Sequence, residues 1–225
     1  MAADDYRSII AEAGRRDSYL KSPYFRPYVD PHDDPRDGIY RVGPLARLNV
    51  CERMGVPAAD EALTEYRERA GGIASSSFYY HYARLIEILF SIEKVEEILD
   101  HSDVLSKEVT AHARRNRYEG VGCSEAPRGT LFHHYKVKGG GLITWANFII
   151  ATGQNNLPMN QTVLQIAKHF VDGKKLKEGM LNRVEAGIRA FDPCLSCSTH
   201  AYGEMPLKIE LREADGALVD SVTRG

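Results

Sequence analysis

The spacing of apolar residues changes along this chain, and that change limits most strongly what it can fold into. From Ser77 to Leu99, apolar side chains recur at three- and four-residue steps with charged residues between them, which predicts a long amphipathic helix. Three serines before it, 75–77, offer N-caps. The face expected to be buried carries Phe78, Tyr82, Leu85, Ile86, Leu89 and Val95. Shorter segments with helical spacing predict further helices at 44–54, 60–69, 159–171 and 178–191.

Other segments have the two-residue period of β-strands. Residues 131–137 and 142–152 predict a hairpin across three consecutive glycines, and 207–222 predicts another with Asp215-Gly216 at its turn. The polar residues 1–20 predict a short helix, and four prolines within 21–38 predict a connector without regular structure. Together the segments predict an α+β fold, predominantly α-helical with a small antiparallel sheet.

Size and composition exclude several classes of protein. A chain of 225 residues with 43% hydrophobic and 27% charged residues can bury one substantial core. Its formal net charge of −2 gives no basic face for a nucleic acid. No apolar run approaches the roughly 20 residues that span a bilayer. The first five residues also lack the features of a secretory signal, so the sequence predicts a cytoplasmic protein.

The chemistry of the chain concentrates near residue 195. Cys51 and Cys123 are isolated, whereas Cys194 and Cys197 form a Cys-x-x-Cys pair followed by His200. Two thiolates at this spacing can converge on one nickel, zinc, copper(I) or iron ion. A lone pair of this kind is a weak signal, because a zinc half-site or an incidental pair would look the same.

The surrounding residues narrow the interpretation. The stretch from Asp192-Pro193-Cys194 to Cys197 and His200 resembles the C-terminal signature of nickel–iron hydrogenase large subunits, and so does Glu125-Ala126-Pro127-Arg128-Gly129 upstream. Three further segments resemble the soluble, bidirectional, NAD(P)-linked branch of that family, namely 40–49, 78–87 and 179–185.

The resemblance implies a ligand set for a Ni-Fe(CN)2CO centre. Cys194 would be a terminal thiolate on nickel, and Cys197 would bridge nickel and iron. His200 would bind Mg2+ or another divalent ion, with the main-chain carbonyl of Phe148 as a further ligand.

The resemblance also implies polar groups around the centre. Arg128 would hold its guanidinium above the open metal face, Asp192 would join it in the surrounding shell, and the Thr152 hydroxyl would bond a cyanide. A fixed positive charge beside a site where H2 is polarised fits heterolytic cleavage. Without the resemblance, Arg128 would more simply pair with a carboxylate.

The sequence departs from the family in two respects. A family site needs two Cys-x-x-Cys pairs and a glutamate for the magnesium, whereas only one pair is present here. We therefore expect residues 1–200 to be the C-terminal part of a large-subunit domain. Residues 201–225 would be an extension that a maturation endopeptidase removes.

The resemblance implies partners as well, namely a small iron–sulfur subunit together with diaphorase-type electron-transfer subunits. Two alternatives stay open: a non-catalytic truncated remnant or structural subunit, and a zinc-binding module that uses the Cys-x-x-Cys-x-x-His motif.

Overall fold

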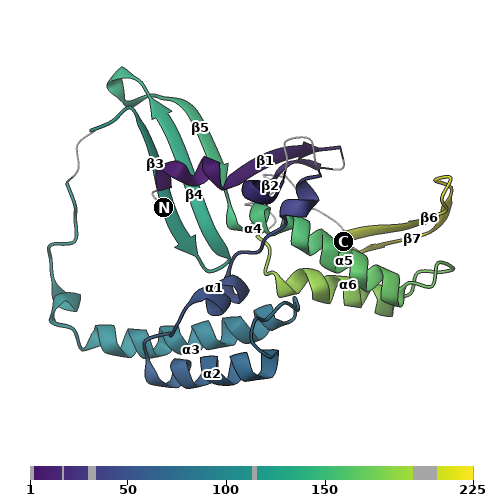
Figure 1. Ribbon diagram of the computed structural model, residues 1–225, viewed down its shortest axis with the longest axis horizontal. Coiled ribbons are helices and arrows are strands. Elements are labelled where there is room, and N and C mark those ends of the chain that lie inside the picture. The colour runs from purple at the N-terminus through teal and green to yellow at the C-terminus, as the bar shows by residue number, and fades with distance from the viewer. Residues whose placement is uncertain (1–2, 17, 30–33, 113–115, 195–206, 225) are drawn as a thin grey trace. The chain divides into compact units, whose positions relative to one another are not determined.

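The computed structural model describes residues 3–16, 18–29, 34–112, 116–194 and 207–224 (Figure 1). The chain divides into two compact units. The first unit contains residues 1–6 and 42–149, and the second contains 7–41 and 150–225. Both combine helices with small antiparallel sheets, as the sequence predicts. Within the described residues, every helix is too short or too polar to cross a membrane.

Three helices of the first unit pack together. They are α1 (Pro44–Val50), α2 (Pro57–Ala70) and α3 (Tyr79–Leu99), and both shorter helices contact α3. A proline begins α1 and α2, where the missing N–H costs no helical hydrogen bond. Glu93 of α3 accepts the N–H groups of Ala58 and Ala59 at 3.1 and 2.9 Å, so it caps the first turn of α2. The predicted serine cap of α3 is wrong, because its N-cap is Phe78, without a side-chain hydrogen bond.

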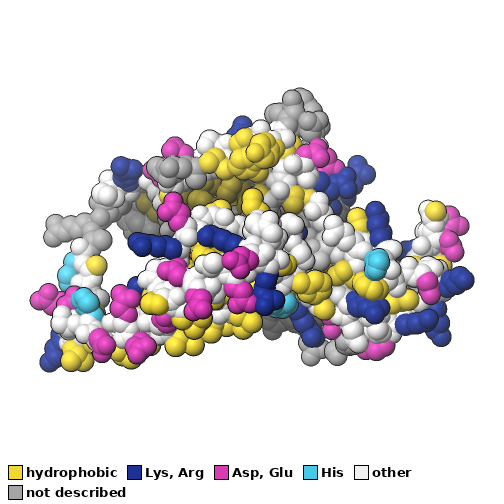
Figure 2. All heavy atoms as spheres, turned by 60° about the horizontal axis from the view of Figure 1, so that its bottom comes forward, with side chains coloured by type: hydrophobic (Ala, Val, Ile, Leu, Met, Phe, Trp, Pro, Cys, Tyr) yellow, Lys and Arg dark blue, Asp and Glu magenta, His cyan; other side chains and the backbone are white. Residues whose placement is uncertain are grey.

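The two sides of α3 have different surroundings. Tyr80, Ala83 and Ile86 are buried and form the inner face of the helix. A second set lies at heptad spacing and is at least half exposed; we call it the outer stripe, and it consists of Leu85, Ile88, Ile92, Val95 and Leu99. In Figure 2 hydrophobic side chains gather over this part of the unit, with acidic side chains beside them. The expected core face is therefore wrong at Phe78, Leu85 and Val95, which are exposed, whereas Ile86 is buried and Tyr82 and Leu89 are half-buried.

The sheet of the first unit has the order β3-β4-β5, with all pairs antiparallel. Its strands are β3 (Glu119–Ala126), β4 (Gly129–Val137) and β5 (Ile143–Ile149). The predicted hairpin of β4 and β5 is confirmed, although β5 ends three residues early. Strand β3 was not predicted, because its glycines and polar residues have low strand propensity. Tyr6, from a 3-10 helix at Ala3–Ser8, stacks on Phe132 and bonds the ring of the buried His134.

The second unit begins with a hairpin of β1 (Ile10–Arg15) and β2 (Ser18–Phe25). Of the short helix predicted within 1–20, only the 3-10 helix at Ala3–Ser8 forms. The strands show that a helix is wrong for 10–20 and that an irregular connector is wrong for 21–25. Three helices follow, α4 (Ala151–Gln154), α5 (Asn156–Phe170) and α6 (Glu178–Ala190). A Cβ atom at Gly187 of α6 would lie 2.4 Å from the terminal methyl carbon of Ile166 of α5, so a side chain there would require that methyl group to move. The predicted terminal hairpin is confirmed as β6 (Leu207–Arg212) and β7 (Leu218–Arg224).

Candidate metal centre

The end of α6 delivers Cys194. The helix stops at Ala190, and the buried Phe191 follows as its C-cap. Asp192 then adopts a left-handed conformation with φ of 50°, and its N–H donates to the Arg189 carbonyl at 3.0 Å. Aspartate tolerates this conformation better than most residues, and the next residue, a proline, cannot continue a helix. The Asp-Pro dipeptide thus turns the chain out of the helix just before the first cysteine of the motif.

Thr152 holds the backbone of Cys194. The Cys194 N–H donates to the Thr152 hydroxyl oxygen at 3.2 Å, across 42 positions of sequence. Thr152 lies in the first turn of α4 and is 6% exposed. A hydroxyl that accepts one hydrogen bond still carries its own O–H donor. The threonine therefore bonds the thiol-bearing segment and keeps a proton available for a further acceptor, which is compatible with the role that the resemblance implies.

Two residues that sequence reasoning did not select support these elements. The Tyr40 hydroxyl donates to the Gln154 side-chain oxygen at 2.8 Å, which ties α4 to the 40–41 segment. Burial raises the pKa of the Tyr40 phenol above its ordinary value, so the group stays a neutral donor. The Arg41 guanidinium lies over the Phe191 ring, 5.9 Å from its centroid. The sequence signal that could have identified Tyr40 and Arg41 is the 40–49 segment, which resembles the family, although the resemblance assigned no role to its residues.

Arg128 lies at the tip of the β3–β4 hairpin in the first unit. Ala126 pairs with Gly129, so Pro127 and Arg128 form a two-residue turn. Arg128 is half-buried and makes interactions of its own.

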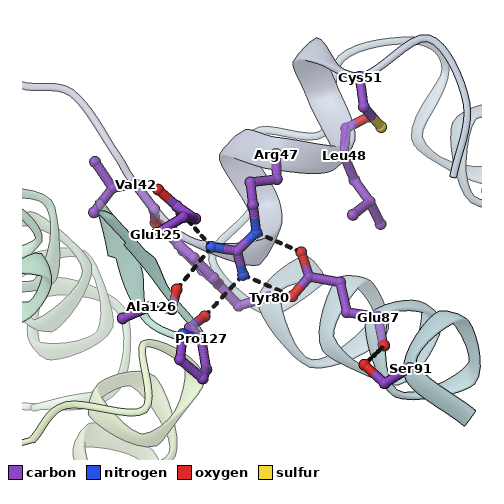
Figure 3. Close-up of polar contacts among 10 residues, drawn as sticks. All are labelled: Val42, Arg47, Leu48, Cys51, Tyr80, Glu87, Ser91, Glu125, Ala126 and Pro127. Atoms are coloured by element: carbon purple, nitrogen blue, oxygen red, sulfur yellow. Dashed lines mark hydrogen bonds and ion pairs between the residues drawn. The ribbon is translucent and has the colours of Figure 1, made fainter. Parts of the chain in front are cut away.

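The guanidinium of Arg47, on α1, binds this turn (Figure 3). Its Nη1 donates to the Ala126 carbonyl at 3.1 Å and its Nη2 to the Pro127 carbonyl at 2.8 Å. Nε and Nη2 also bond the two oxygens of Glu87, at 2.6 and 2.7 Å, and Nη1 pairs with Glu125. Sequence reasoning did not identify Arg47, although it lies in the 40–49 segment.

Phe148 lies in β5 of the first unit, opposite His133 of β4. Its ring contacts the His133 ring at a centroid distance of 4.9 Å, and the side chain is 45% exposed. The fold confirms that Phe148 lies in the second strand of the predicted hairpin, and it does not test the predicted role of its carbonyl as a metal ligand. His200, the other expected ligand of that ion, is outside the described residues.

The predicted site residues thus fall into three groups. Thr152, Asp192 and Cys194 lie together in the second unit, and Arg128 and Phe148 belong to the first. Cys197 and His200 are outside the described residues. Within the part of the chain that is described, no three His, Cys, Asp or Glu side chains are grouped to hold a metal ion. In this candidate site the sulfur of Cys194 is a soft donor on a fixed backbone, and the sequence places the sulfur of Cys197 and the imidazole of His200 just after it.

The Asp-Pro-Cys segment, with Cys197 and His200 after it, is typical of a class of metal-dependent oxidoreductases. The family model described as nickel-dependent hydrogenase matches residues 5–200. The chain belongs to the nickel-dependent hydrogenase family.

Its relatives include the NAD-reducing hydrogenase HoxS subunit beta of Cupriavidus necator. The two are 42% identical over 224 residues, which are 98% of this chain and 45% of the relative. One of the F420-non-reducing hydrogenase subunits of Methanococcus voltae, of the vhc type, is 39% identical over 94% of this chain and 44% of its own length. The solved structure of an NAD+-reducing nickel–iron hydrogenase in the H2-reduced state matches with a TM-score of 0.79 and 45% identity, covering 88% of this chain and 43% of that chain. This chain thus spans less than half the length of these relatives.

Proposed function

We propose that this chain is the C-terminal part of the catalytic subunit of a nickel–iron hydrogenase, which interconverts H2 with protons and electrons. One observation carries the proposal: a chain in this family retains Asp192-Pro193-Cys194 with Cys197 and His200, and the backbone of Cys194 is fixed by the buried Thr152. A packing scaffold alone would not need this set of soft metal donors, and it would not need to fix the backbone beside one of them.

Cys194 and Cys197 would supply two thiolates to the Ni-Fe(CN)2CO centre. His200 and the carbonyl of Phe148 would bind Mg2+ or another divalent ion. When bound, the nickel–iron centre supplies the redox chemistry for H2. The residues of this chain would bind and orient it.

Three polar residues would act around that centre. Arg128 would present a permanent positive charge, which favours polarisation of H2 and does not consume a proton. Asp192 would orient that guanidinium, and the Thr152 O–H would donate to a cyanide. Arginine is a poor base at ordinary pH, so Arg128 would act through its charge, and a cysteine thiolate of the chain would be the better proton acceptor.

Electrons would leave through a small iron–sulfur subunit, and then through diaphorase-type subunits, to an acceptor such as NAD(P)+. The relative from Cupriavidus necator is by name NAD-reducing, which supports this acceptor. The outer stripe of α3 also supports assembly with other polypeptides, since five large apolar side chains at heptad spacing are exposed on one helix. We place this assembly in the cytoplasm.

A test is the metal content and H2-dependent dye reduction of the protein purified from its native cells with its partners. We expect nickel and iron in equal amounts, and loss of both activity and nickel in Cys197→Ser. Cys123→Ser is the matched control, because Cys123 is an exposed, free cysteine on β3, and it should keep both. The mass of the chain in the same sample should show an end at His200 if the extension is removed on maturation.

A non-catalytic role, as a structural subunit, is the second candidate, and the same measurements separate it from the hydrogenase. Absence of nickel together with a full-length mass would favour it over the hydrogenase. One zinc per chain, lost in Cys197→Ser, would instead identify a zinc-binding module.

A further inference from the structure

Arg47 uses every donor of its guanidinium at one place. Arginine has five N–H donors in a rigid plane, and here all five are engaged: two with Glu87, one with Glu125 and one each with the carbonyls of Ala126 and Pro127. The side chain is 26% exposed and that of Glu87 is 19% exposed, so these charged groups are largely removed from water. Such a group has no spare donor and little freedom to change partner.

Two of these bonds end on the backbone that precedes Arg128. The carbonyls of Ala126 and Pro127 belong to the last two residues before it, and both accept from the same guanidinium (Figure 3). A simple ion pair between α1 and α3 would need only Glu87. The carbonyl contacts instead tie α1 to the turn that carries Arg128.

The other side of the turn is held by close packing. A Cβ atom at Gly43 would lie 2.6 Å from the Arg128 carbonyl oxygen, and one at Gly129 would lie 2.4 Å from Val42. Both glycines have positive φ, at 92° and 138°, so a side chain there would also strain the backbone. The Val42 carbonyl in turn accepts a hydrogen bond from the buried Tyr80 hydroxyl at 2.9 Å. The backbone of Arg128 is therefore confined between residues 42–43 and the guanidinium of Arg47.

We propose that Arg47 is a positioning residue, which fixes the 126–129 turn so that the Arg128 side chain starts from one backbone position. This inference rests on the proposed function, because a fixed position of Arg128 matters for catalysis only if Arg128 acts in the reaction of H2. Lysine cannot replace arginine here: it has the same charge but lacks the planar fork, so it cannot bond Glu87 and both carbonyls together. Reaction rates are sensitive to such placement, since a displacement of about 1 Å can cost about a hundredfold.

The test compares Arg47→Lys with Arg69→Lys in the enzyme assembled with its partners. Arg69 is the matched control, because it also pairs with a glutamate in the same unit, Glu65 at 2.6 Å, and the 126–129 turn is not among its partners. We expect kcat for H2-dependent dye reduction to fall about a hundredfold in Arg47→Lys, with KM for H2 and nickel content unchanged. Arg69→Lys should match the parent.

Hydrogen exchange in the same variants gives a readout independent of activity. In Arg47→Lys, exchange of the amide hydrogens of residues 126 and 128–130 should accelerate about tenfold, while the amide hydrogens of α3 keep their exchange rates. Unchanged exchange at the turn, or equal acceleration in α3, would overturn the positioning role and leave Arg47 a structural ion pair. If the parent protein has no H2 activity, the proposed function fails, and the exchange comparison still decides whether Arg47 fixes the turn.

Discussion

The inner and outer faces of α3 show how one helix can serve two purposes. The inner face supports the Arg128 turn, because Tyr80 bonds the Val42 carbonyl and Glu87 bonds Arg47 at 2.6 and 2.7 Å. The outer face carries large apolar side chains that stay exposed. Two polar groups of this helix, the Tyr80 hydroxyl and the Glu87 carboxylate, thus find partners within the unit, whereas several of its most hydrophobic residues stay exposed. The contrast shows that hydrophobicity alone does not identify the core-facing side of a helix whose polar groups find partners.

The largest effect on the free energy of unfolding should come from shortening a buried side chain of the inner face. Ile86 is 2% exposed, so Ile86→Ala should lower the free energy of unfolding of the first unit by about 2–5 kcal/mol, through lost transfer energy and the cavity left behind. Urea denaturation followed by circular dichroism measures this change. Ile92→Ala is the matched control on the outer face, where the residue is 62% exposed, and a similar loss there would remove the distinction between the faces.

A smaller effect is expected from the polar part of the inner face. Tyr80→Phe keeps the ring of a fully buried residue and removes only the hydrogen bond to the Val42 carbonyl. The free energy of unfolding should fall by about 1 kcal/mol, a typical net value for one hydrogen bond. Amide hydrogen exchange at residues 126 and 128–130 should also accelerate slightly, because Val42 packs on Gly129. If stability does not change, the hydroxyl is not what fixes the Val42 segment.

The smallest effect on stability should come from the outer stripe. Replacing Ile88 and Ile92 by glutamine should change the free energy of unfolding by no more than about 0.5 kcal/mol per site, because both side chains are already in contact with water. The same double variant should lower the fraction of the chain that co-elutes with the small subunit in size-exclusion chromatography of the native assembly. Normal co-elution would show that the stripe is not part of that assembly.

Much of the secondary structure could be predicted from local pattern. The helices at 57–70, 79–99, 156–170 and 178–190 follow three- and four-residue spacing, and the hairpins at 129–149 and 207–224 follow a two-residue period with glycine-containing turns. The hairpin at 10–25 was not predicted, because its sequence is polar and contains Pro23 within β2. Strand β3 was missed for a related reason: it is mostly exposed, so it has no apolar face to reveal it.

The candidate site was accessible to sequence reasoning only in part. Cys194, Asp192, Arg128 and Thr152 were predicted through the resemblance, and the hydrogen bond between the Thr152 hydroxyl and the Cys194 N–H brings two of them together. Arg47, Tyr40 and Gln154 were not found, since their partners lie 40 or more positions away in the sequence. Side chains that position others leave no local pattern, because their role is defined entirely by what the fold brings beside them.

By itself, the sequence determined the helical and strand periods, the Asp-Pro-Cys exit from α6 and the family to which the chain belongs, because each depends on residues that are close in sequence. Only the tertiary structure decided which face of α3 is buried and which arginine holds the 126–129 turn. The physical reason is that burying a tyrosine hydroxyl or a glutamate is costly until a specific partner satisfies it, and that partner is known only once the chain has folded.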